Sequence, residues 1–204
     1  VYDDAGTQIF PVAAAFFEDF ETGNRFNAGN TSALTRASGS AYAGSFGGQL
    51  RASSDYVQIY DDSQTYGPSA TFKYAAYVRC DFGPQHPFRA PALCLVQGGS
   101  NLDNGYQFLL DARDDSADIR VDWGFNDAVT SGKLGFGDNG GLDGEWVWLE
   151  VTWPSVGSLN LEIYDTKGGT LLGSVSRSNS KYSSLYLGVG AYSEGSVDNI
   201  EFTA

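Results

Sequence analysis

In the last third of the chain, successive side chains alternate between two faces with a period of two, and this pattern constrains the fold more than any other. From residue 145 to 153 one face would carry Trp146, Trp148, Glu150 and Thr152, and the other Val147, Leu149, Val151 and Trp153. Such alternation is typical of a half-buried antiparallel strand. Residues 159–164 repeat the pattern, and Lys167-Gly168-Gly169 predicts a turn into a further strand. Residues 145–202 therefore predict a series of antiparallel strands.

Earlier segments show the same alternation of side chains. Strands are expected at residues 56–60, 70–80, 105–112 and 118–124, the last two as a hairpin, and the Gly/Asp/Asn-rich residues 126–144 predict a loop. In the 70–80 segment, Phe72, Tyr74, Ala76 and Val78 are expected to face the core. With 26 glycines, 42% apolar residues and a length of 204, the chain fits one all-β domain.

The order of the late segments resembles the laminin-G/concanavalin-A-like jelly-roll sandwiches. It consists of the Trp-rich strand, a strand, a glycine turn, a strand, the run Leu185-Tyr186-Leu187-Gly188-Val189-Gly190, and a terminal Val197-Asp198-Asn199-Ile200. The resemblance implies an all-β, two-sheet antiparallel jelly-roll sandwich. Sandwiches of this kind include lectins, lyases, hydrolases and structural subunits, so the resemblance does not decide the activity.

Residues 1–15 are expected to form an extended arm in front of a single domain at 16–204. From Ile9 to Phe17 the chain is apolar at nearly every position, which indicates a strand buried on both faces. Ile9, Phe10, Val12 and Phe16 are the candidate anchors. The arm either pairs with its own sheet or completes the sheet of a neighbouring subunit, and the second arrangement would propagate into a filament.

The formal charge of −13 disfavours nucleic acid and anionic membranes as partners. No apolar run reaches the ~18 residues of a membrane span. Cys80 and Cys94 lie in consecutive strand-like segments and are expected to face each other as a disulfide, with two buried thiols as the alternative. A disulfide would indicate export to an oxidising medium, and thus an extracellular or cell-surface location.

Catalysis has little support in the sequence. His86 is the only histidine and lies between prolines in a loop. Glu150 and Glu162 fall on consecutive strands and could form the carboxylate pair of a glycoside hydrolase, but the Glu-x-Asp-x-x-Glu motif of sandwich-fold glucanases is absent. Tyr77 with Arg79, or Arg120 with Tyr164, could serve a polysaccharide lyase, although no lyase motif accompanies them. A non-enzyme is therefore favoured.

Glycan binding is supported by aromatic residues that share a face with charged ones. The candidate residues are Trp146, Trp148, Glu150, Arg120, Asp122, Tyr164 and Tyr186, provided that their strands are neighbours in one sheet. Sugars stack their CH-rich faces on rings and pair their hydroxyls with charged groups. The alternative is that the tryptophans cover a sheet edge or face another layer.

The resemblance also implies a structural Ca²⁺. In similar jelly-roll binding modules, the Phe-Glu…Gly of the first strand and the Asp of a terminal segment hold this ion. Here these elements are Phe20-Glu21-Thr22-Gly23 and Asp198-Asn199-Ile200, with Asp19 as a further ligand, although Asn199 replaces the second acid. The candidate ligands are Asp19, Glu21 and Asp198.

The function expected first is a non-catalytic, exported structural subunit that self-associates through its N-terminal arm. The alternative is a lectin-like module that binds glycan through its aromatic face. An enzyme acting on polysaccharide, as lyase or hydrolase, comes third.

Overall fold

The computed structural model describes residues 16–51, 57–65, 72–80, 88–98, 105–113, 118–125, 133–138, 144–155, 158–178, 185–192 and 194–203. The expected arm at 1–15, including Ile9, Phe10 and Val12, and the loop that contains His86 lie outside these residues. Of the arm's candidate anchors, Phe16 alone is described, as the first residue of β1.

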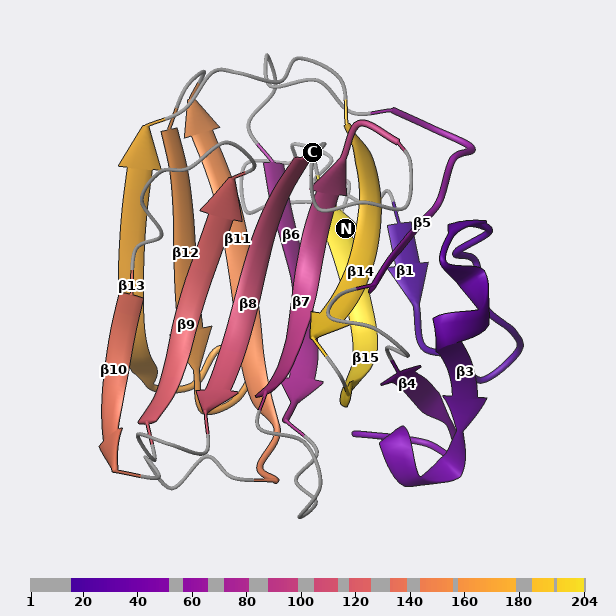
Figure 1. The fold of residues 1–204 in the computed structure, drawn as a ribbon, viewed down its shortest axis with the longest axis horizontal. Helices are drawn as coiled ribbons and strands as arrows, with labels where there is room; N and C mark the ends of the chain where they lie inside the picture. Colours follow the sequence, from indigo (N-terminus) through magenta and orange to yellow (C-terminus); the bar gives the residue numbers. More distant parts are fainter. Residues whose placement is uncertain are drawn as a thin grey trace, which may run out of the picture.

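The described strands form two antiparallel sheets that lie face to face (Figure 1). The eight-stranded sheet has the order β13 (Leu171–Ser178), β12 (Ser158–Tyr164), β11 (Val147–Ser155), β6 (Phe72–Arg79), β15 (Glu194–Thr203), β4 (Gly47–Arg51) and β3 (Leu34–Ala37), and β1 (Phe16–Glu18) also pairs with β15. The seven-stranded sheet has the order β10 (Lys133–Asp138), β9 (Asp118–Phe125), β8 (Gly105–Arg113), β7 (Phe88–Val96), β14 (Tyr186–Tyr192), β5 (Val57–Tyr60) and β2 (Ala28–Gly29).

Helical structure among the described residues is limited to two single turns, η1 (Thr31–Ala33) and η2 (Ser38–Ser40). Within the described part of the chain, no helix has both the length and the apolar character needed to cross a bilayer.

The core lies between the two sheets and follows the alternation seen in the sequence. In β11 the side chains of Val147, Leu149, Val151 and Trp153 are buried in it, as are those of Phe72, Tyr74, Ala76 and Val78 in β6. β11 pairs with β12 along one edge and with β6 along the other, so one of its faces is turned toward the core and the other away from it. The all-β sandwich and the inward face of both strands are confirmed.

Two local predictions differ in outcome. The hairpin of β8 and β9 is confirmed, with Phe108 opposite Trp123. The loop expected at 126–144 is interrupted by β10, which pairs with β9 at the edge of the seven-stranded sheet. Gly135, Gly137 and Asp138 lie within β10. Turn-forming residues therefore do not exclude an edge strand, where only one side of the strand must pair.

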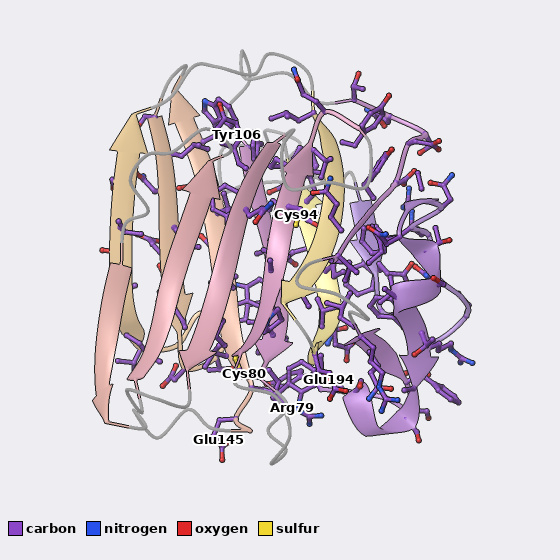
Figure 2. The ribbon with its side chains drawn as sticks, viewed as in Figure 1. Arg79, Cys80, Cys94, Tyr106, Glu145 and Glu194 are labelled. Atoms are coloured by element: carbon purple, nitrogen blue, oxygen red, sulfur yellow. The ribbon has the colours of Figure 1, made fainter. Side chains whose placement is uncertain are left out.

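The predicted disulfide is wrong. Cys80 and Cys94 are both buried thiols. Cys80 directly follows β6 in the eight-stranded sheet and packs in the main core, whereas Cys94 belongs to β7 in the other sheet and to a separate cluster. Figure 2 shows the two cysteines well apart along the length of the strands. The two strands are consecutive in sequence, but the chain crosses from one sheet to the other between them.

Candidate functional site

An aromatic row crosses the outer face of the eight-stranded sheet. The register places Trp148 of β11 opposite Tyr164 of β12 and Tyr77 of β6, and Tyr164 opposite Leu171 of β13. Because directly opposed side chains on one face of a sheet touch, this register brings four large side chains into a line across four strands. Trp148, Glu150 and Tyr164 of the predicted glycan site therefore do lie together.

Trp148 is covered rather than open. Its side chain is 1% exposed, with the Tyr77 ring against it at a centroid distance of 4.9 Å and the Lys167 ammonium 5.2 Å from its ring centre. Its indole N–H donates to Glu150 Oε2 at 3.1 Å. The ring is thus a packing element beneath the turn between β12 and β13, as the alternative interpretation of the tryptophans expected.

The open aromatic surface lies beside Trp148, at a site that we call the Tyr42–Trp146 corner and that consists of Tyr42, Tyr77, Trp146 and Arg79. Tyr42 stacks on Tyr77 with centroids 3.5 Å apart and planes 14° from parallel, and it remains 40% exposed. The Trp146 ring is 5.8 Å from Tyr42 at 74°. The Arg79 guanidinium is 4.8 Å from the Trp146 ring centre. Tyr42 and Trp146 therefore form the floor and wall of a right-angled corner.

Several contacts hold the floor of this corner in place. Asp198 is fully buried, and its Oδ2 accepts hydrogen bonds from the backbone amides of Tyr42 at 2.8 Å and Ala43 at 3.2 Å. Thr166 bonds the Tyr77 hydroxyl at 2.8 Å and lies 3.4 Å from the Tyr42 hydroxyl. The loop after η2 and the β12–β13 turn thus meet over Tyr77.

Electrostatics at the two supporting residues follow from this packing. Burial alone would raise the pKa of the Tyr77 hydroxyl, but hydrogen bonds with Thr166 and Tyr42 and from the Lys167 backbone amide outweigh burial and lower the pKa. Burial raises the pKa of Asp198, although three backbone amides oppose the rise.

The predicted pair of carboxylates is also brought together. Glu150 and Glu162 are directly opposite in β11 and β12. Lys73 makes a 2.8 Å ion pair with Glu150, and the Tyr164 hydroxyl donates to Glu162 Oε2 at 2.7 Å. Both carboxylates are therefore engaged by neighbouring side chains, Glu150 by an ammonium group and Glu162 by a phenol hydroxyl.

Three predicted glycan residues are separated from the others. Arg120 and Asp122 lie in β9 and Tyr186 in β14, and both strands belong to the seven-stranded sheet. The condition that all seven candidates share one sheet is therefore not met for these three. Alternation within a strand identifies a face, but it does not tell which sheet the strand joins.

Comparisons with solved structures find the same architecture. Carbohydrate-binding module CBM66 from Bacillus subtilis is 15% identical, with a TM-score of 0.58 over 84% of this chain and 96% of the module. Winged bean acidic lectin complexed with methyl-α-D-galactose is 11% identical, with a TM-score of 0.59 over 92% and 97% of the two chains. The exoplasmic/lumenal domain of VIP36, in a form bound to Ca²⁺ and Man3GlcNAc, is 12% identical, with a TM-score of 0.56 over 83% and 81%.

The chain is a jelly-roll β-sandwich. At these identities the likeness shows the fold alone. No family model and no curated protein matches the sequence.

The predicted calcium ligands of this jelly roll point toward backbone amides. Asp19 Oδ1 accepts from the Glu21 amide at 3.0 Å, and Glu21 Oε1 accepts from the amides of residues 45 and 46 at 2.6 and 2.9 Å. These bonds lower the pKa of Glu21. Asp198 bonds three further amides, including that of Asn199 at 2.9 Å.

The nearby carbonyl groups are engaged as well, because the Arg36 guanidinium donates to the backbone oxygens of Phe20 and Glu21. Ca²⁺ takes six to eight oxygen ligands, including carboxylates and backbone carbonyls. Among the described residues, no cluster of three or more acidic, histidine or cysteine side chains is arranged to hold a metal ion. The donors therefore do not fit a calcium site. The guanidinium of Arg36 binds the backbone carbonyls in the place that a metal ion would take.

Sequence reasoning missed Tyr42. It lies in a Ser/Gly-rich stretch without alternation, between η2 and β4, so no periodic signal marks it. The available signal is a lone aromatic residue in a glycine-rich loop, Ser40-Ala41-Tyr42-Ala43-Gly44. Loop aromatics on a rigid scaffold are common in binding sites.

Proposed function

We propose that this protein binds glycan, without turnover, at the Tyr42–Trp146 corner. The observation that carries the proposal is the ring of Tyr42, which is 40% exposed, fixed flat on Tyr77 and set at 74° to Trp146. A sugar ring offers a CH-rich face for stacking and hydroxyls at its edge, and a floor with an aromatic wall accepts both.

Polar groups around the corner suit the hydroxyls of a sugar. The Arg79 guanidinium beside Trp146 is a fixed donor, because it is also bonded to the Gly39 carbonyl at 2.7 Å. Thr166 brings a hydroxyl to within 3.4 Å of the Tyr42 hydroxyl. Polar groups placed in this way determine orientation and specificity, while the rings supply contact area.

The corner is also preorganised. Tyr42 is held through its backbone by Asp198 and through its ring by Tyr77, so little side-chain freedom remains to be lost on binding. The architectural neighbours, a carbohydrate-binding module and lectins, support the same function at the level of the fold.

A glycan array followed by titration of the intrinsic tryptophan fluorescence tests the proposal. Tyr42→Ala and Trp146→Ala should each weaken binding about tenfold or more, since loss of a stacked ring costs about 1–1.5 kcal/mol and 1.4 kcal/mol is tenfold. Leu172→Ala is the matched control, because Leu172 is 37% exposed on β13 of the same sheet but away from the corner. If Tyr42→Ala and Trp146→Ala bound glycan with the same affinity as the Leu172→Ala control, the proposal would be contradicted.

Other expectations stay predictions. Filament assembly and self-association through the arm concern residues outside those described. A location outside the cell loses its main sequence argument, because the two cysteines are thiols. A calcium ion between Asp19, Glu21 and Asp198 is not supported by the bonding of these groups.

A further inference from the structure

The turn between β12 and β13, at residues 165–170, has a fixed shape. The backbone amides of Asp165 and Thr170 each bond an oxygen of the other residue, at 3.1 and 2.7 Å. The Gly169 amide donates to the Thr166 carbonyl at 2.9 Å. Gly168 has a φ of +72°, which residues with a side chain rarely adopt. These constraints hold the backbone of Thr166 in place, although its side chain is exposed.

The turn is also fastened to the sheet through the residue next to Thr166. The Lys167 ammonium makes a 2.5 Å ion pair with Glu201 of β15, and the Lys167 backbone amide donates to the Tyr77 hydroxyl at 3.1 Å. Thr166 Oγ1 then lies 2.8 Å from the Tyr77 hydroxyl and 3.4 Å from the Tyr42 hydroxyl. Thr166 is therefore a fixed polar group at the hydroxyl edge of the Tyr42 ring.

The directions of these hydrogen bonds follow from the groups that make them. A backbone amide can only donate, so the Tyr77 oxygen accepts from Lys167. The proton of the neutral Tyr77 phenol therefore points away from that amide, and Thr166 Oγ1 at 2.8 Å is its acceptor. The Tyr77 hydroxyl is thus engaged both as donor and as acceptor, and it fills one lone pair of Thr166.

The Thr166 and Tyr42 hydroxyls together leave one proton for another molecule. They lie 3.4 Å apart, and either of them can donate to the other. Each hydroxyl carries a single proton, so whichever one accepts keeps its own O–H group. The pair therefore offers one hydrogen-bond donor beside the ring of Tyr42, which is 40% exposed.

We infer that Thr166 is a specificity-determining residue of the Tyr42–Trp146 corner, and that it selects pyranosides with a hydroxyl group over that edge of the Tyr42 ring. The inference rests on the proposed glycan binding. A sugar hydroxyl accepts the proton that the pair offers and has a proton of its own to donate. A deoxy sugar brings a CH₂ group to the same place and leaves the donor without a partner, and a site built to bond a hydroxyl rejects an analogue that lacks it.

Tryptophan fluorescence titrations of the wild-type protein test the inference without any substitution. The probes are the methyl pyranosides of glucose, galactose and mannose, with the monodeoxy forms of each. For a pyranoside whose binding is weakened by Tyr42→Ala, one deoxy form should bind at least about fivefold more weakly than its parent. Equal affinity for all deoxy forms and their parents would overturn the inference and leave the proposed function in place. If Tyr42→Ala weakened the binding of none of the pyranosides, both would be overturned.

Variants then assign the discrimination to Thr166. Thr166→Val keeps the shape and removes the hydroxyl, so it should bind the parent sugar no better than the deoxy form, while Thr166→Ser should keep the preference. Thr170→Val is the matched control and should also keep the preference, because Thr170 is exposed on the same turn and bonds Asp165 through its backbone. Equal weakening of both sugars in Thr166→Val, with their ratio unchanged, would show a merely structural role and overturn the inference.

A further variant covers the case in which Thr166→Val does not fold. Tyr42→Phe keeps the stacking ring and leaves Thr166 as the one hydroxyl of the pair. Its proton is then directed to the sugar, so the preference for the parent over the deoxy form should persist. Loss of that preference in Tyr42→Phe would assign the donor to Tyr42 and overturn the role of Thr166.

Discussion

Asp198 of the last strand accepts a 2.8 Å hydrogen bond from the backbone amide of Tyr42, a residue 156 positions earlier in the chain. The carboxylate is fully buried, and its second oxygen accepts from the Asn199 amide. Asn199 has a φ of +49°, so the strand bulges at this point and turns the carboxylate toward the loop. The C-terminal strand thereby positions the floor of the Tyr42–Trp146 corner.

Asp198→Asn should therefore affect both stability and binding. An amide keeps one acceptor but turns an N–H group toward a backbone N–H, and a buried unsatisfied group costs about 1–3 kcal/mol. Urea denaturation should show a loss of that size. Asn199→Ala is a control for the bulge itself, and we expect it to cost stability through its positive φ. An Asp198→Asn variant as stable as the wild type would show that the loop is held by other contacts.

Much of the fold follows from local alternation in the sequence, but the corner does not. Trp146 was identified because its strand alternates, and the opposition of Glu150 and Glu162 follows from consecutive strands joined by a short turn. Tyr42 was missed because its position depends on Asp198, a contact of long sequence separation.

The errors share one physical cause. Cys80 and Cys94 were expected opposite each other because their strand-like segments flank one loop, and Arg120 or Tyr186 could lie with Trp146 only if their strands shared a sheet. Alternation has the same period in both layers of a sandwich, so it cannot tell which sheet a strand joins. Pairing between distant strands decides that, and it is visible only in the folded chain.

Trp153 gives a test of core packing with an unusual feature. Its side chain is fully buried against Phe72 and Tyr106, at centroid distances of 5.4 and 5.8 Å. Its indole N–H has no hydrogen-bond partner among the described residues. Trp153→Phe should cost less than about 1.5 kcal/mol, because it keeps much of the packing and removes an unpaired donor. Trp153→Ala should cost about 3–5 kcal/mol. A loss of stability in Trp153→Phe as large as that in Trp153→Ala would mean that the indole N–H group makes a stabilising hydrogen bond.

Calcium should leave the thermal stability unchanged. The carboxylates of Asp19, Glu21 and Asp198 bond backbone amides, and Arg36 bonds the carbonyls of the same turn. We expect the same melting temperature in EDTA and in millimolar CaCl₂, with MgCl₂ as the ionic control, and a lower one for Arg36→Ala. A rise in melting temperature with CaCl₂ but not MgCl₂ would restore the calcium site expected from the sequence.

Tyr164 gives a prediction for alkaline pH. Its hydroxyl donates to Glu162 Oε2 at 2.7 Å, and this bond, together with burial and the charges of Glu162 and Glu150, raises the pKa of Tyr164 from 10.0 to about 12. Between these two values the unfolded chain loses the phenol proton while the folded chain keeps it. The contribution of Tyr164 to stability is therefore complete below pH 10.0 and is lost as the pH rises toward about 12.

An ultraviolet titration of tyrosinate, taken as the difference between wild type and Tyr164→Phe, isolates this group among the 12 tyrosines. The difference curve should have its midpoint near 12, and in a Glu162→Gln background it should move down toward 10.0, because the carboxylate that favours the protonated phenol is gone. A midpoint of 10.0 in both backgrounds would show that the Tyr164–Glu162 bond is absent in solution. The aromatic row would then present Tyr164 to the solvent as a second ring for sugar stacking, beside the Tyr42–Trp146 corner.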